Sequence, residues 1–206
     1  MLAIIDYGVG NLFSLSSSLK SIGEETIITN DLDTIEKADR IILPGVGAFE
    51  DAARKLRESG MAEVVLSQAA KGKPLMGICL GMQLMFDKSM EYGEHDGLGL
   101  IPGIVRPIAE VIDPKLKIPH IGWNALDITA EGGLMKYAKQ GDHVYFVHSY
   151  WADTPMEFVT SRTEYSAWLT GSVQRGNVMG TQFHPEKSGE VGLNMLKAFC
   201  EMEGAK

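Results

Sequence analysis

Residues Pro74-Leu75-Met76-Gly77-Ile78-Cys79-Leu80-Gly81 join a short apolar run to a cysteine that glycines flank on both sides. The run 74–78 predicts a buried strand, and residues 82–86 predict the opening of a helix. A sharp turn from strand to helix presents a nucleophilic side chain above a sheet, and the two glycines leave room for that turn. The stretch therefore predicts an α/β fold that carries a reactive cysteine, Cys79.

Short aliphatic runs alternate with helical segments through the first half of the chain. Strands are expected at 2–5, 26–28, 40–43 and 74–78, and helices at 11–22, 49–59 and 61–71. Nearly continuous aliphatic strands that alternate with helices indicate a parallel sheet covered on both faces.

Shorter strands and turns dominate the second half. Strands are expected at 98–108, 118–128, 143–150 and 157–163, then a hairpin at 167–183 and a helix near 189–201. No repeat or linker composition divides the sequence. We therefore predict a single domain, residues 1–206, with a mixed, mainly parallel and flavodoxin-like central sheet, flanking helices and antiparallel additions in the C-terminal half.

The composition is ordinary for a globular protein, with 206 residues, 45% hydrophobic and 22% charged. The formal net charge of −8 comes with no basic stripe, which argues against a nucleic-acid partner. The N-terminus does not resemble a signal peptide, and no apolar run approaches the roughly 20 residues of a membrane span. These features predict a cytoplasmic protein with no membrane partner.

A second candidate segment, His184-Pro185-Glu186, ends another expected strand. Residues two apart in an extended chain share a face, so Glu186 is placed to accept an imidazole N–H from His184. The other ring nitrogen is then free to take a proton from Cys79. Taken alone, a His-x-Glu pair is typical of a surface salt bridge. Together with Cys79, it predicts a nucleophile, a base and an orienting acid for acyl chemistry.

Cys79 has two other interpretations. Free cysteines are often small buried hydrophobic residues, and Cys79 and Cys200 together are enough for one disulfide. The glycine-flanked turn favours a reactive thiol at Cys79, whereas Cys200 lies in the expected C-terminal helix and is interpreted as structural. Of the remaining histidines, His148 is the one we keep as a candidate for lining the site.

The glycine-rich loop Leu43-Pro44-Gly45-Val46-Gly47-Ala48-Phe49 follows the third expected strand. Its amides would suit a phosphate, but it lacks the residues of a P-loop, and a plain tight turn is a further interpretation. Beside a cysteine nucleophile, the amides near Val46 and Gly47 are better suited to stabilise an oxyanion together with the amide of Leu80.

Three motifs, PGVGAF at 44–49, GICLGMQ at 77–83 and QFHPEKS at 182–188, resemble those of the class I, triad-type glutamine amidotransferases. Within that family, the segments 6–11, 121–124 and 145–150 resemble the glutaminase subunits of imidazole glycerol phosphate synthases. The resemblance covers essentially the whole chain, in order.

The resemblance implies hydrolysis of L-glutamine to glutamate and ammonia through a thioester on Cys79, with His184 and Glu186 completing the triad. It needs neither a cofactor nor a metal. It also implies a (β/α)-barrel cyclase subunit as heterodimer partner, which uses the ammonia to make imidazole glycerol phosphate and aminoimidazole carboxamide ribotide in histidine biosynthesis. The implied substrate-binding residues are Gln83, Glu91, Ser149 and Tyr150, and the implied interface residues are Asn11, Trp123, Tyr145 and Lys187.

Two alternatives remain open at this point. The first is an amidotransferase subunit of another pathway, such as pyridoxal phosphate synthesis, and the Trp123 segment argues against it. The second is a cysteine-elbow α/β protein that acts as a peptidase, a stress protein or a silent binding module. That interpretation leaves Gln83 and the distant segment 184–186 unexplained.

Overall fold

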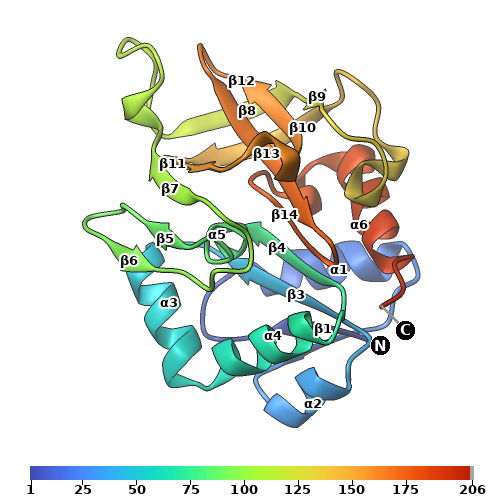
Figure 1. Ribbon diagram of the computed structural model, residues 1–206. Helices are drawn as coiled ribbons and strands as arrows, with labels where there is room; N and C mark the ends of the chain where they lie inside the picture. Colours follow the sequence, from blue (N-terminus) through green and yellow to red (C-terminus); the bar gives the residue numbers. More distant parts are fainter. Residues whose placement is uncertain (205–206) are drawn as a thin grey trace.

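A mixed sheet forms the centre of the molecule, with the strand order β2-β1-β3-β4-β14-β13-β12-β9 (Figure 1). The computed structural model describes residues 1–204. The parallel strands are β1 (Leu2–Ile5), β2 (Thr26–Thr29), β3 (Arg40–Gly45), β4 (Leu75–Cys79) and β14 (Val178–Thr181). The antiparallel additions are β13 (Trp168–Arg175), β12 (Val159–Glu164) and β9 (Asp127–Ile128). The predicted fold class is thus confirmed.

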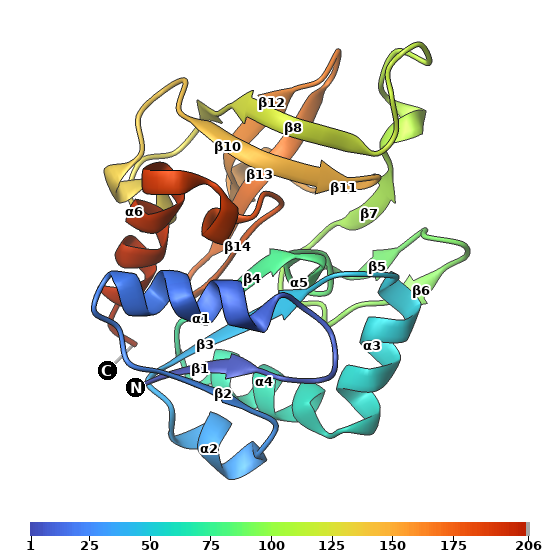
Figure 2. The same cartoon turned by 180° about the vertical axis from the view of Figure 1, so that it is seen from behind.

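Helices cover both faces of this sheet (Figures 1 and 2). Alternate residues of β3 point to opposite sides, so Ile41 and Leu43 pack in one apolar cluster and Ile42 packs in another. The first cluster contains side chains of α2 (Leu32–Lys37), α3 (Phe49–Glu58) and α4 (Met61–Ala70). The second contains side chains of α1 (Leu12–Ser21) and α6 (Gly189–Cys200). Among residues 1–204, no helix has the length and apolar character to cross a membrane.

Two smaller sheets stand beside the central one. One pairs β8 (His120–Ala125) with β10 (His143–His148). The other has the order β11-β7-β5-β6, and its strands are β11 (Tyr150–Asp153), β7 (Ile104–Pro107), β5 (Lys88–Ser89) and β6 (His95–Asp96). Short 3-10 helices lie at η1 (Ile108–Glu110), η2 (Gly133–Tyr137), η3 (Met156–Phe158) and η4 (Pro185–Lys187).

Several expected elements have the wrong extent. The strand expected at 118–128 is divided between β8 and β9, the strand expected at 143–150 between β10 and β11, and only residues 104–107 of the strand expected at 98–108 are extended in a ladder. Each division lies where the chain leaves one sheet and enters another, which an apolar pattern does not mark. Helix α2 was not expected. It begins after Asp31, whose carboxylate accepts the N–H of Thr34 at 2.9 Å.

The prediction that a helix opens at residues 82–86 is also wrong. Helix α5 (Leu80–Gln83) is a single turn. The carbonyls of Leu84, Met85 and Phe86 accept backbone N–H groups from residues 98–101 instead of continuing a helix. A tertiary contact thus ends the helix that local sequence favours.

The turn after β4 packs backbone against backbone. Cys79 is the last residue of β4 and has a φ of 55°, which non-glycine residues rarely adopt. A Cβ added to Gly81 would lie 1.8 Å from the carbonyl oxygen of Leu43, and one added to Gly77 would lie 2.6 Å from the amide nitrogen of Met82. The two glycines are therefore required for the close approach that the sequence predicted around Cys79.

Replacing Gly81 with Ala tests this close approach. The added methyl meets a backbone oxygen that cannot move aside, so we expect a loss of stability on the order of 3 kcal/mol or more. Urea denaturation measures it. The matched control is Gly204→Ala, where the nearest atom lies 3.4 Å away. Equal stabilities of the two variants would contradict the packing.

Candidate active site

A cavity of about 600 Å³ opens at the carboxyl ends of β3 and β4. In open parallel sheets, ligands bind beyond this edge. The cavity gathers sequence segments from both halves of the chain. Its lining includes Val46, Gly47, Cys79, Leu80, Gln83, Glu91, His148, Ser149, Tyr150 and His184. The fold thus brings together every residue to which the sequence gave an oxyanion or substrate role, and also His148.

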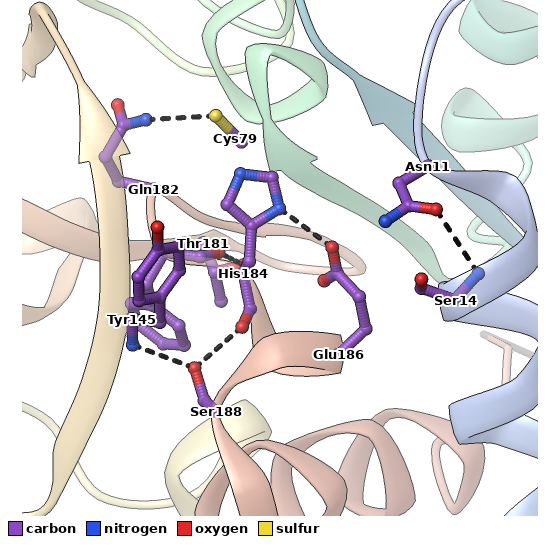
Figure 3. A network of polar contacts seen from close by, with 10 residues as sticks. Asn11, Ser14, Cys79, Tyr145, Thr181, Gln182, His184, Glu186 and Ser188 are labelled. Atoms are coloured by element: carbon purple, nitrogen blue, oxygen red, sulfur yellow. Dashed lines mark hydrogen bonds and ion pairs between the residues drawn. The ribbon is translucent and has the colours of Figure 1, made fainter. Parts of the chain in front are cut away.

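His184 and Glu186 form the expected hydrogen-bonded pair (Figure 3). Nδ1 of His184 lies 2.8 Å from Oε1 of Glu186, and only 3% and 4% of their side chains are exposed. The backbone N–H of His184 donates to the carbonyl of Tyr145 at 3.0 Å. The hydroxyl of Ser188 donates to the carbonyl of His184 and accepts the N–H of Tyr145. The segment after β14 is therefore fixed to strand β10.

The charge state of His184 depends on Cys79 and Glu186. Burial alone lowers the pKa of His184, but hydrogen bonds with Cys79 and Glu186 and their negative charges outweigh it and raise the pKa to about 9. At neutral pH the ring is therefore an imidazolium, and it lies beside the sulfur of Cys79. Both cysteines are free, so the disulfide alternative is wrong.

The end of β3, just before Val46 and Gly47, is tied to the segment that follows strand β1. The hydroxyl of Tyr7 donates to the carbonyl of Pro44 at 2.7 Å. Burial, and then the negative charge of Cys79, raise the pKa of Tyr7, so the hydroxyl keeps its proton. Gly47 has a φ of 98°, which a side chain would strain. The loop is held beside the cysteine turn, and the oxyanion role of its amides stays a prediction.

The side chain of Gln83 has a restricted role in the cavity. Its Nε2 donates to the carbonyl of Tyr150 at 3.2 Å and to Oε1 of Gln182 at 2.9 Å. Because both N–H groups are engaged, only the Gln83 carbonyl oxygen is available to a ligand.

Glu91 contacts the loop and helix on the other side of the cavity. Its Oε2 accepts the N–H of Phe49, the first residue of α3, at 2.8 Å. Partial burial raises the pKa of Glu91, while the Phe49 N–H and His95 act in the opposite direction. The carboxylate thus already caps a helix, and binding of a ligand ammonium group there stays a prediction.

Of the four residues expected at a partner interface, Lys187 lines the cavity, whereas the other three do not. The rings of Trp123 and Tyr145 meet edge to face at 6.1 Å, and Nζ of Lys187 lies 5.8 Å from the Tyr145 ring centre. Trp123 is 55% exposed. Asn11 is exposed, caps α1 through the N–H of Ser14, and lines a small cavity with His184 and Glu186. Their docking role stays a prediction.

Two contacts in the site were missed from the sequence. Nε2 of Gln182 lies 3.7 Å from the sulfur of Cys79 (Figure 3). Nδ1 of His120 lies 3.0 Å from Nε2 of His148, whose Nδ1 lies 2.8 Å from the Tyr150 carbonyl. Gln182 is the first residue of the motif QFHPEKS at 182–188, so the sequence did mark it as a candidate site residue. His120 carried no such signal, because its partner lies on another strand.

Replacing His184 with Asn tests the charge of the imidazole. The pKa rises from about 6.5 in an unfolded chain to about 9 in the fold. The contribution of the charged ring to stability is then fully present below about pH 6.5 and is lost as the pH rises through about 9. We expect the stability difference between the parent protein and the variant to shrink across this window in urea denaturation. A difference independent of pH would contradict the raised pKa.

Known proteins match almost the whole length of this chain. The model of the family "Glutamine amidotransferase class-I" matches residues 3–202. The imidazole glycerol phosphate synthase subunit HisH of Bacillus mycoides is 49% identical over 199 residues, which cover 97% of this chain and 93% of the relative. The subunit of the same name from Listeria monocytogenes is 45% identical over 202 residues, with 98% and 96% covered.

A solved structure shares the fold at lower sequence identity. PurLQS from Thermotoga maritima superposes with a TM-score of 0.75 and 21% identity, with 97% of this chain and 96% of that chain covered. The family match spans nearly the full length, the relatives are close to half identical, and the motif residues meet in one cavity. This chain therefore belongs to the class I glutamine amidotransferases.

Proposed function

We propose that this protein is the glutaminase subunit of an imidazole glycerol phosphate synthase. One observation carries the proposal: a thiol, an imidazolium and a carboxylate meet at a cavity of about 600 Å³ that is lined by the residues expected to bind glutamine. The names of the relatives support the choice of this enzyme within the family.

The first half of the reaction forms a thioester. The thiolate of Cys79 attacks the carboxamide carbon of glutamine, a C–S bond forms, and the carbonyl electron pair moves onto oxygen. Amides of Leu80 and of the Val46–Gly47 loop stabilise that oxyanion. The intermediate collapses as the C–N bond breaks, and the imidazolium of His184 protonates the departing nitrogen, which leaves as ammonia.

The second half restores the enzyme. Neutral His184 takes a proton from water, the hydroxide attacks the thioester carbon, and the C–S bond breaks to release glutamate and the Cys79 thiolate. Glu186 holds the imidazole by its Nδ1–H and stabilises the imidazolium in both halves. The sum is glutamine and water giving glutamate, ammonia and the proton of the new carboxyl group.

A partner that receives the ammonia directly is part of the proposal. Ammonia released to bulk water at neutral pH becomes ammonium, which is not a nucleophile. We propose a (β/α)-barrel cyclase subunit, docked over Asn11, Trp123, Tyr145 and Lys187, that uses the ammonia in histidine biosynthesis. The proposal includes a single amidotransferase domain acting in the cytoplasm, without a cofactor or metal.

Replacing Cys79 with Ala tests the chemistry. With the cyclase and imidazole glycerol phosphate present, we expect glutamate release from glutamine to fall by roughly 10⁴-fold or more, because no nucleophile remains. The control is Cys200→Ala, since burial raises the pKa of the Cys200 thiol to about 12 and keeps it inert. Normal turnover by Cys79→Ala would exclude the mechanism.

Replacing Trp123 with Ala, alone and together with Lys187→Ala, tests the interface. An exposed tryptophan at the centre of an interface is a typical hot spot, so we expect binding to the cyclase to weaken by roughly 30-fold or more in calorimetric titration. Trp168→Ala is the matched control, because Trp168 is also exposed but packs against Arg162 instead of Tyr145. Unchanged affinity in the double variant would count against this docking surface.

A further inference from the structure

The side chain of Gln182 is completely buried beside the sulfur of Cys79. Its Nε2 lies 3.7 Å from Sγ, which is within reach of a hydrogen bond to sulfur. Gln182 does not line the cavity, so its Nε2 contacts the sulfur of Cys79 and not a ligand. No step of the reaction described above uses this contact.

The direction of this hydrogen bond follows from a backbone carbonyl elsewhere in the site. The oxygen and nitrogen of a glutamine amide have nearly the same shape, so hydrogen-bond partners must decide which is which. The Tyr150 carbonyl can only accept, so Gln83 must turn its NH₂ group toward it. The second N–H of Gln83 then requires the oxygen of Gln182 as acceptor. Gln182 is left with its NH₂ group facing Cys79.

The Tyr150 carbonyl is itself fixed from the other side. Because a carbonyl accepts, Nδ1 of His148 carries the proton and Nε2 of His148 accepts from Nδ1 of His120. Burial lowers the pKa of His148 to about 3, so its ring stays neutral and keeps this tautomer at neutral pH. The His120 ring is held by stacking on Phe146 and Tyr165.

We infer that Gln182 is a further catalytic residue, which donates an N–H to the Cys79 sulfur and favours the thiolate over the thiol. Hydrogen bonds to a charged acceptor are stronger than those to a neutral one, so the donor stabilises the ionised form selectively. Gln83 and His148 are positioning residues, because they act on the sulfur only through Gln182. The inference rests on the proposed function of this same site.

Alkylation of Cys79 by iodoacetamide across a range of pH tests the inference in the full-length chain. Cys200 does not interfere at neutral pH because of its raised pKa. In Gln182→Leu, loss of a hydrogen bond to a charged group is expected to move the midpoint of the pH profile upward by roughly one pH unit. The matched control is Gln68→Leu, a buried amide in α4 that lines no part of the cavity, and its midpoint should not move.

Steady-state kinetics with the cyclase and imidazole glycerol phosphate give a second readout. We expect Gln182→Leu to lower kcat roughly tenfold with KM within about twofold, because the residue does not line the cavity. Gln83→Met should move the alkylation midpoint in the same direction by less, since Gln182 remains but loses its fixed orientation, and it should also raise KM.

An unchanged alkylation midpoint in folded Gln182→Leu overturns the inference. If that variant does not fold, an unchanged midpoint in Gln83→Met overturns it instead. A parent protein that releases no glutamate from glutamine, with the cyclase and imidazole glycerol phosphate present, overturns the proposed function, while the alkylation profiles still decide the role of Gln182.

Discussion

The contact between the turn after β4 and the end of β3 is the constraint on which the site depends. The carbonyl of Leu43 lies so close to Gly81 that a methyl group would not fit between them. This contact holds Cys79 at a positive φ and places its sulfur beside the loop that starts at Gly45. Nucleophile and candidate oxyanion donors therefore come from neighbouring parallel strands whose spacing the ladder sets. A side chain at either flanking glycine would separate them.

Different contacts position the base, His184, beside the nucleophile. His184 follows β14, the parallel strand next to β4, so the sheet order alone brings His184 to the same edge as Cys79. Its exact placement comes from β10, through the bonds to Tyr145 and Ser188. Tyr145 also contacts Trp123 and Lys187 at the surface. A partner docked on those side chains would therefore press on the backbone that carries the base.

Burial strengthens the electrostatic interactions among the polar groups of the site. His184, Gln182 and Gln83 are all at most 5% exposed, so each hydrogen bond forms without competition from water. Oε2 of Glu186 is buried and has no partner within residues 1–204, which leaves the carboxylate bonded through one oxygen to His184. In the proposed mechanism, the charge of the thiolate is balanced by the imidazolium of His184 and the amide of Gln182 instead of by solvent.

The amino-acid sequence by itself determined the strands β1 to β4, the helices α1, α3, α4 and α6, and the motifs that carry Cys79, His184 and Glu186. These follow from apolar periodicity, glycine spacing and residue chemistry, which are local properties of the chain. Only the tertiary structure decided that α5 is one turn, because the carbonyls of residues 84–86 bond to a loop near residue 100. It also decided which way the Gln182 amide faces, and the proposed role of Gln182 rests on that orientation. The orientation of its amide depends on a carbonyl at Tyr150 and imidazoles at His148 and His120, and a hydrogen-bond direction set by distant partners leaves no local pattern in the sequence.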